Sequence, residues 1–262
     1  MPNLELNGRP LDLADTQRLL ARPYAHYTSM QVRGGRVRGL ALHMARLDDG
    51  NETFFGARMD LDGEHRLREL IRHALGDQAD ASVRVALVTA DDEQAPPDVL
   101  VSVSDAQAPA PGPPLRVRTD QFQRGWPEQK HAATMGAALA RRRALGAGYD
   151  DALLLGPDRT VREGTTWNAA FWDGEKVIWP QAPVLKGVTM VLLQVAMTMT
   201  GVPWALRPVT AAELPDLLAA AAVSALRPAQ PIAAIDEVVF PEGTRLTAVL
   251  TQAWSTVPWD EI

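Results

Sequence analysis

The sequence predicts a two-domain α+β protein, and three observations support this prediction. Strand-like and helix-like segments alternate through residues 1–106. Residues 107–115 then read QAPAPGPPL, which cannot continue a strand, because proline fixes φ and lacks a backbone donor. A second mixed set of strands and helices fills residues 116–262. We therefore expect a small N-terminal α+β domain, a Pro/Ala-rich linker at 107–115 and a larger C-terminal domain.

The first domain begins with a turn at Asn7-Gly8. A hairpin is expected where HYTSMQV and VRGLAL flank the tight turn RGGR, since both stretches alternate in polarity. Two amphipathic helices follow from the helical spacing of apolar residues, and two valine-rich stretches predict buried strands. In chain order, these strands and helices are expected at 26–32, 37–42, 42–55, 64–75, 82–90 and 98–104.

The second domain opens with a helix over HAATMGAALARRRAL, which Gly146 and Gly148 should stop. The strand DDALLLG follows, and then a hairpin, AAFW with EKVIW, that Asp173-Gly174 closes. The stretch KGVTMVLLQVAM predicts an apolar helix with Gly187 and Thr189 at its start.

Composition excludes several classes of function. The chain of 262 residues has no cysteine, so disulfides, thiolate metal sites and cysteine nucleophiles are ruled out. Its 32 acidic and 26 basic residues give a net charge of -6, which argues against nucleic acid or an anionic membrane as a partner. The longest apolar runs fall short of the roughly 20 residues that a membrane span needs. We expect a soluble cytoplasmic protein with no metal site.

Two positions are candidates for binding an anion. Residues 187–189 open an apolar helix, and the free N–H groups at a helix start form a ready phosphate site. On the local sequence alone, the usual interpretation of Thr189 is a simple helix cap. Arg46 lies on the first amphipathic helix, where the alternative is a solvated arginine paired with Asp48 or Glu52.

Two further positions are candidates for chemistry. Lys130 lies between a proline-broken strand end and a helix rich in small residues. A lysine in an apolar pocket loses its charge readily and becomes a Schiff-base nucleophile, although most lysines are surface residues. Glu163 is a lone acid in the neutral stretch EGTTWN, and the usual interpretation is a turn carboxylate bonded to neighbouring N–H groups.

The order of these four positions resembles the class IV aminotransferase family, which uses pyridoxal phosphate (PLP). The family pattern has an H-x-x-R-L helix, a lysine before a helix, an acid followed five residues later by asparagine, and a turn with glycine and threonine. Members include branched-chain and D-amino-acid aminotransferases, (R)-selective amine transaminases and aminodeoxychorismate lyase. The resemblance extends from Tyr27 to Met190, through RGLALHMARL, KHAATMGAALARRRALGAGYDDALLLGPDRTVREGTTWNAAFW and WPQAPVLKGVTM, with a looser match near SALRPAQPI.

This resemblance implies the two-domain fold of D-amino-acid aminotransferase, known as PLP fold type IV. In that fold the cofactor lies between the domains, the larger C-terminal domain binds it, and a homodimer completes the pocket. The implied substrates are an amino acid or amine and a keto acid.

The resemblance also implies a role for each candidate residue. Lys130 would form the Schiff base and then move protons as acid and base. Glu163 would face the pyridine nitrogen of PLP and keep it protonated. Arg46, with the N–H groups of Val188 and Thr189 and the Thr189 hydroxyl, would hold the phosphate. Thr165, Thr166 and Ser224 are weaker cofactor candidates, and Tyr27 and Ser29 are expected to line the substrate pocket.

The reaction itself stays open among three hypotheses. The first is an aminotransferase, which is the commonest activity in the family. The second is a lyase that releases pyruvate, as aminodeoxychorismate lyase does, because KHAATM has Met135 where many family aminotransferases have a tyrosine. The third is a PLP-binding protein without catalysis, which the presence of both Lys130 and Glu163 disfavours. Arg84 has no assigned place in the site.

Overall fold

The computed structural model describes residues 3–92, 94–107, 111–241 and 245–262, and the chain divides into two compact units. Unit 1 comprises Met1–Ala108, Gln129–Ala133 and Pro258–Ile262, and unit 2 comprises Pro109–Glu128 and Thr134–Val257. The sequence placed all of 116–262 in one domain, whereas this division puts Lys130 and the last five residues in unit 1. Of the expected linker, residues 108–110 lie outside the described residues.

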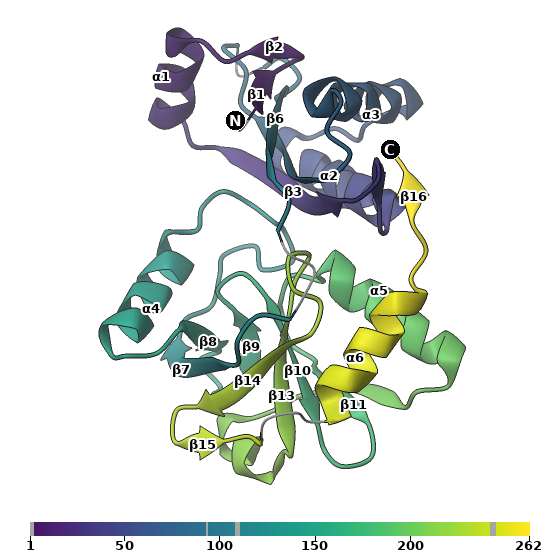
Figure 1. The fold of residues 1–262 in the computed structure, drawn as a ribbon. Coiled ribbons are helices and arrows are strands. Elements are labelled where there is room, and N and C mark those ends of the chain that lie inside the picture. The colour runs from purple at the N-terminus through teal and green to yellow at the C-terminus, as the bar shows by residue number, and fades with distance from the viewer. Residues whose placement is uncertain (1–2, 93, 108–110, 242–244) are drawn as a thin grey trace. The chain divides into compact units, whose positions relative to one another are not determined.

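Unit 1 contains an antiparallel sheet with the strand order β2-β1-β6-β5-β3 (Figure 1). The pairing of β3 with β5 runs from Ala25 opposite Val88 to Val32 opposite Ala81. The strands expected at 26–32, 82–90 and 98–104 are therefore confirmed. The strands are β1 (Asn3–Leu6), β2 (Arg9–Pro10), β3 (Ala25–Val32), β5 (Ala81–Val88) and β6 (Asp98–Asp105).

Two helices cover one face of this sheet, and a short helix covers part of the other. The helices α2 (Leu40–Phe55) and α3 (Leu61–Leu75) bury Leu47 and Ile71 against Met30 and Val85 of the sheet. Helix α1 (Leu13–Ala21) contributes Leu19 to a smaller cluster on the opposite face. The two amphipathic helices expected in this half are thus confirmed.

The strand expected over VRGLAL is largely wrong. Strand β4 contains only Arg36–Val37, and the chain then turns into α2 at Leu40. The turn occurs at Gly39, which has a φ of 74° and is the N-cap of α2. Glycine adopts this left-handed conformation without steric cost, so the alternating pattern stops where the glycine lies.

The last residues of the chain complete unit 1. Strand β16 (Asp260–Glu261) pairs with β4, and the Asp260 carboxylate accepts a hydrogen bond of 2.9 Å from the backbone N–H of Leu40. Gly39 has no side chain with which to cap α2. An aspartate 220 residues away in the sequence therefore supplies the cap at the start of this helix.

Unit 2 contains a mixed sheet with the order β12-β11-β10-β13-β14-β7-β8-β9, and β15 pairs with β14 (Figure 1). The β7–β8, β7–β14 and β11–β12 pairs are parallel. The strands are β7 (Leu115–Gln121), β8 (Asp151–Leu155), β9 (Val161–Gly164), β10 (Asn168–Trp172), β11 (Val177–Pro180), β12 (Trp204–Arg207), β13 (Ala219–Val223), β14 (Gln230–Ile235) and β15 (Val238–Val239).

Helices pack on this sheet in two places. Helices α5 (Val188–Thr200) and α6 (Arg245–Thr256) form a core with β10, β11 and β13, and α4 (Met135–Gly146) packs on β8. A 3-10 helix spans Ala211–Asp216. The β10–β11 hairpin and the apolar helix α5 match the sequence prediction, whereas α4 begins four residues later than HAATMG suggested. No helix in the described parts of the chain is long and apolar enough to cross a membrane.

Candidate active site

Lys130 lies on a short segment that extends the sheet of unit 1 at the edge of β3. The backbone N–H of Tyr27 donates to the Lys130 carbonyl, and the N–H of Ala132 donates to the Ala25 carbonyl, both at 2.8 Å. Two backbone hydrogen bonds therefore fix the lysine beside Tyr27. The sequence placed Lys130 directly before a helix, and this docking explains why that helix starts only at Met135.

The Tyr27 ring lies within a cluster of cations. The Lys130 Nζ is 4.9 Å from the ring centroid, and the Arg84 Cζ is 3.6 Å from it. Tyr27, Ser29 and Arg84 share the sheet face that α2 and α3 leave uncovered, and Ser29 is directly opposite Arg84 in the β3–β5 register. Cation–π contacts of this kind hold a guanidinium in place without neutralising it, so the cluster can bind anionic groups.

Arg46 and His43 project from α2 near the same cluster. Burial lowers the pKa of Arg46 to about 10. The charge of the nearby Tyr27 acts in the opposite direction and partly offsets this lowering. Burial, and then the charges of Arg46 and Lys130, lower the pKa of His43 to about 3, so this histidine is neutral. His43 shares a hydrogen bond of 2.6 Å with the Thr28 hydroxyl through Nδ1. The suggested pairing of Arg46 with Asp48 or Glu52 is wrong, because Arg58 is the partner of those acids.

Glu163 lies buried at the end of β9 in unit 2. Its Oε1 accepts a hydrogen bond of 2.8 Å from Arg124 Nε, and its Oε2 receives a long contact of 3.4 Å from the Leu185 N–H. The side chains of Arg124 and Glu163 are only 10% and 9% exposed. The carboxylate is therefore part of a buried ion pair, beyond the turn carboxylate bonded to neighbouring N–H groups that the local sequence suggests.

The turn that precedes α5 is held next to Glu163. Asn168 Nδ2 donates to the Leu185 carbonyl at 2.8 Å, and a Cβ on Gly187 would come within 2.1 Å of Asn168 Oδ1. Only glycine fits there, so the chain passes tightly over Asn168 into the helix.

The first N–H groups of α5 have no intrahelical acceptors, as at any helix start. Gly187, not Thr189, is the N-cap, so the capping alternative for Thr189 is wrong. Thr189 is 3% exposed, and among the described residues its hydroxyl makes no hydrogen bond. A phosphate would satisfy both these N–H groups and this hydroxyl.

The weaker candidates have defined neighbours in unit 2. The Thr165 hydroxyl donates to Asp151 at 2.7 Å, and Asp151 also accepts from Trp167 Nε1, so this aspartate fixes the segment after Glu163. Thr166 is exposed. The Ser224 hydroxyl accepts from the Arg227 N–H, in the turn after β13.

The structure thus gathers the candidates into two groups, one in each unit. Lys130, Tyr27, Ser29 and Arg46 are in unit 1, and Glu163, Val188, Thr189, Thr165, Thr166 and Ser224 are in unit 2. Three residues that contact these candidates or the turn before α5, namely Asn168, Arg84 and Arg124, were given no role by the sequence. Asn168 could have been found, because it is the asparagine of the family pattern, five residues after Glu163. Arg84 and Arg124 gave no sequence signal that separates them from ordinary strand and loop arginines.

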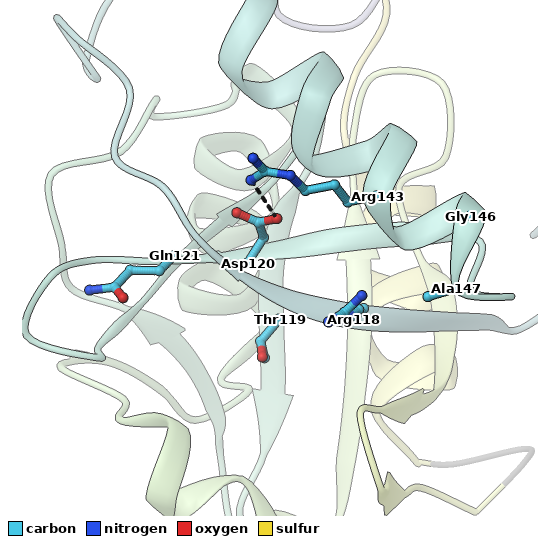
Figure 2. Close-up of a pocket in the computed structure, with 7 residues that line it drawn as sticks. All are labelled: Arg118, Thr119, Asp120, Gln121, Arg143, Gly146 and Ala147. Atoms are coloured by element: carbon cyan, nitrogen blue, oxygen red, sulfur yellow. Dashed lines mark ion pairs between the residues drawn. The ribbon is translucent and has the colours of Figure 1, made fainter.

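The described residues also form an open pocket of about 560 Å³ that contains no predicted site residue. It lies in unit 2, where Arg143 of α4 pairs with Asp120 of β7 at 3.5 Å (Figure 2). Its lining residues are Arg118, Thr119, Asp120, Gln121, Arg143, Gly146 and Ala147. Among the same described residues, no group of three or more acidic or histidine side chains could hold a metal ion.

Comparison with protein families identifies a matching family model. The sequence model described as amino-transferase class IV matches residues 25–235. Those residues include each candidate named above, from Tyr27 to Ser224. The comparison with curated proteins gives no match.

Solved structures share the fold. A branched-chain amino acid aminotransferase from Escherichia coli is 16% identical, with a TM-score of 0.82 over 97% of this chain and 93% of that one. The fold IV-transaminase CpuTA1 from Curtobacterium pusillum is 24% identical, with a TM-score of 0.77 over 89% and 84%. A putative 4-amino-4-deoxychorismate lyase from Legionella pneumophila is 16% identical, with a TM-score of 0.79 over 91% and 92%. These likenesses establish the expected PLP fold type IV.

Proposed function

The chain belongs to the class IV aminotransferases, a family of PLP-dependent enzymes, and we propose that it moves an amino group between an amino acid or amine and a keto acid. The observation that carries this proposal is the position of Lys130. Its backbone is bonded to β3, its Nζ lies over the Tyr27 ring that Arg84 also contacts, and its charge, like that of Arg46, lowers the pKa of His43. A lysine whose backbone is held in this way can serve as the Schiff-base nucleophile.

The residues of the chain fit the three polar groups of PLP. Lys130 would bind the aldehyde carbon, and Glu163 would hold a proton at the ring nitrogen. The N–H groups of Val188 and Thr189, the Thr189 hydroxyl and Arg46 would bind the phosphate. When bound, PLP supplies an electron sink that stabilises negative charge on the substrate α-carbon. The released Lys130 amine would then carry the proton from that carbon as a general base and return it as an acid.

The substrate is expected to carry a carboxylate. Arg84 is held on the Tyr27 ring, on the same sheet face as Ser29. A guanidinium binds a carboxylate through two parallel hydrogen bonds, and a fixed guanidinium does so with little loss of entropy. Tyr27 would form the wall of the pocket, and Ser29 would offer a hydroxyl beside Arg84.

Family membership also supports a homodimer in solution. Sedimentation equilibrium tests this part of the proposal, because a monomeric mass over the micromolar range would contradict it.

The proposal is tested by absorbance and mass spectrometry. The purified protein with PLP should be yellow, and borohydride should fix PLP onto Lys130, as a modified peptide would show. A Lys130→Ala variant should bind PLP without this covalent link and lose turnover by several orders of magnitude. A screen of single amino acids and amines should bleach the yellow band when a donor is accepted. A colourless protein that borohydride leaves unmodified would refute the proposal.

One observation keeps the lyase alternative. Met135, which stands where many family aminotransferases have a tyrosine, is the first residue of α4 and is 82% exposed. The same screen separates the two reactions. If no donor bleaches the protein but aminodeoxychorismate yields pyruvate, the chain is a lyase.

A further inference from the structure

We infer that Arg124 is a positioning residue that keeps Glu163 ionised and ties it to the loop leading to Lys130. The inference rests on the proposed function, because it concerns how Glu163 meets the same cofactor. Arg124 Nε donates to Glu163 Oε1 at 2.8 Å, and both side chains are about nine-tenths buried. Arginine stays protonated at any physiological pH, so this buried contact favours the carboxylate over the carboxylic acid.

The same guanidinium makes a second contact within its own loop. Arg124 Nη2 donates to the Pro127 carbonyl, so one rigid group joins β9 to the loop that follows β7. Lys130 comes three residues after Pro127. The fork geometry of arginine permits both bonds at once, whereas the single ammonium of lysine cannot reproduce it.

The loop adopts a conformation that needs such support. Trp126 has a φ of 43°, in the left-handed region that non-glycine residues rarely occupy. A strained residue persists only where its surroundings fix it, and the Arg124 bond to Pro127 spans this residue. The strained residue therefore lies between Arg124, which contacts Glu163, and the residues that lead to Lys130.

Glu163 needs both charge and orientation to hold a proton at a ring nitrogen. A carboxylate has two oxygens and about four acceptor sites, so a hydrogen bond from Arg124 to one oxygen does not by itself prevent Glu163 from accepting from a ring nitrogen. A neutral or rotated Glu163 would leave the pyridine nitrogen without an anion to stabilise its proton. The inferred effect of Arg124 on the cofactor therefore passes through Glu163.

The test compares Arg124→Gln, Glu163→Gln and the double variant with a matched control, Arg162→Gln. Arg162 is the neighbour of Glu163 on β9, its side chain is also 10% exposed, and it pairs with Asp158 instead. Two properties of each purified protein are measured: the dissociation constant for PLP, by titration of the apoprotein, and the visible absorption spectrum of bound PLP between pH 6 and 9.

Arg124→Gln should weaken PLP binding about tenfold or more, because a charged hydrogen bond that orients Glu163 is lost. It should also shift the spectrum in the same direction as Glu163→Gln. In the Glu163→Gln background, the further Arg124→Gln change should alter the PLP dissociation constant less than twofold. Arg124→Lys should restore only part of the affinity, and Arg162→Gln should leave the spectrum unchanged.

The outcomes distinguish this inference from the proposed function. If the native protein binds PLP and Arg124→Gln matches Arg162→Gln in affinity and spectrum, the Arg124 role is wrong and the proposed function stands. If the native protein does not bind PLP, both fail. Thermal unfolding of the apoproteins shows whether Arg124→Gln folds. If it does not fold, Arg124→Lys replaces it, and a native PLP affinity in that variant overturns the inference.

Discussion

At the scale of single residues, unit 1 combines buried neutral histidines with clustered cations. His26 is 1% exposed and packs against Phe54 and Phe55, and burial lowers its pKa to about 4. His43 behaves in the same way on α2. Both histidines face the apolar side of β3, whereas Tyr27 and Arg84 face the other side. The sheet thereby separates these neutral histidines from the contact of Arg84 with Tyr27.

The buried histidines predict that unit 1 loses stability in mild acid. In the unfolded chain a histidine has a pKa of about 6.5, so below that pH the unfolded state binds more protons than the folded state. The free energy of unfolding should therefore fall by about 2 kcal/mol for His26 between pH 7 and pH 5. His26→Gln should remove this part of the loss, as urea unfolding at both pH values can show. His65→Gln, on the exposed face of α3, is the control. If the free energy of unfolding changes equally with pH in both variants, His26 is not the source of the acid sensitivity.

Arg84 predicts a difference between donor classes. Arg84→Gln should raise the KM for amino acid donors about tenfold or more, because the charged hydrogen bonds to a carboxylate are lost. Amines without a carboxylate should be affected little. Arg66→Gln removes the same charge from the exposed surface of α3 and should alter neither class. Equal effects of Arg84→Gln on both donor classes would mean that Arg84 has a structural role and does not bind the substrate.

At the scale of elements, the start of α5 depends on a contact that the helix itself does not supply. Gly187 has a φ of -59°, so its conformation suits any residue, and the need for glycine comes from Asn168 alone. Asn168 also holds the Leu185 carbonyl, and the Leu185 N–H contacts Glu163. Glu163 and the first N–H groups of α5 are the unit 2 groups proposed to contact the ring nitrogen and the phosphate of the cofactor. One turn therefore connects these two groups.

This arrangement predicts the effect of Gly187→Ala. The added Cβ would collide with Asn168 Oδ1 and displace the first N–H groups of α5. PLP should bind about tenfold more weakly, whereas pyridoxal, which lacks the phosphate, should bind as to the native protein. Gly146→Ala is the control, because nothing lies within 4 Å of its added Cβ. An equal loss for PLP and pyridoxal would show that the turn does not act through the phosphate.

Elements with regular spacing were predictable from the sequence, and contacts between distant segments were not. The valine alternation of β5 and the apolar spacing of α3 are local, so the sequence alone located them. The strand expected through Leu40 failed because Gly39 ends the pattern abruptly. The Arg124–Glu163 pair joins residues 39 positions apart, and no periodicity reports such a contact. The same holds for Lys130, whose place beside Tyr27 depends on backbone hydrogen bonds to β3.

At the scale of the whole molecule, chain order and structural units do not coincide. Unit 1 takes its first 108 residues from one end of the chain and its last five from the other, and it also includes Gln129–Ala133. The C-terminal residues cap α2 and pair with β4. Because α2 carries His43 and Arg46, the far end of the chain supports one half of the candidate site.

The cap at α2 predicts that Asp260 stabilises unit 1. Asp260→Ala should lower the free energy of unfolding by about 1 kcal/mol, because the Leu40 N–H loses its acceptor and the helix start loses a favourable negative charge. Urea unfolding measures this loss, and hydrogen exchange should be faster in the first turn of α2. Glu261→Ala is the matched control, since the Glu261 side chain is 80% exposed and contacts only the exposed Arg36 among the described residues. Surface pairs of that kind contribute little, so equal destabilisation by both variants would mean that Asp260 does not act as a cap.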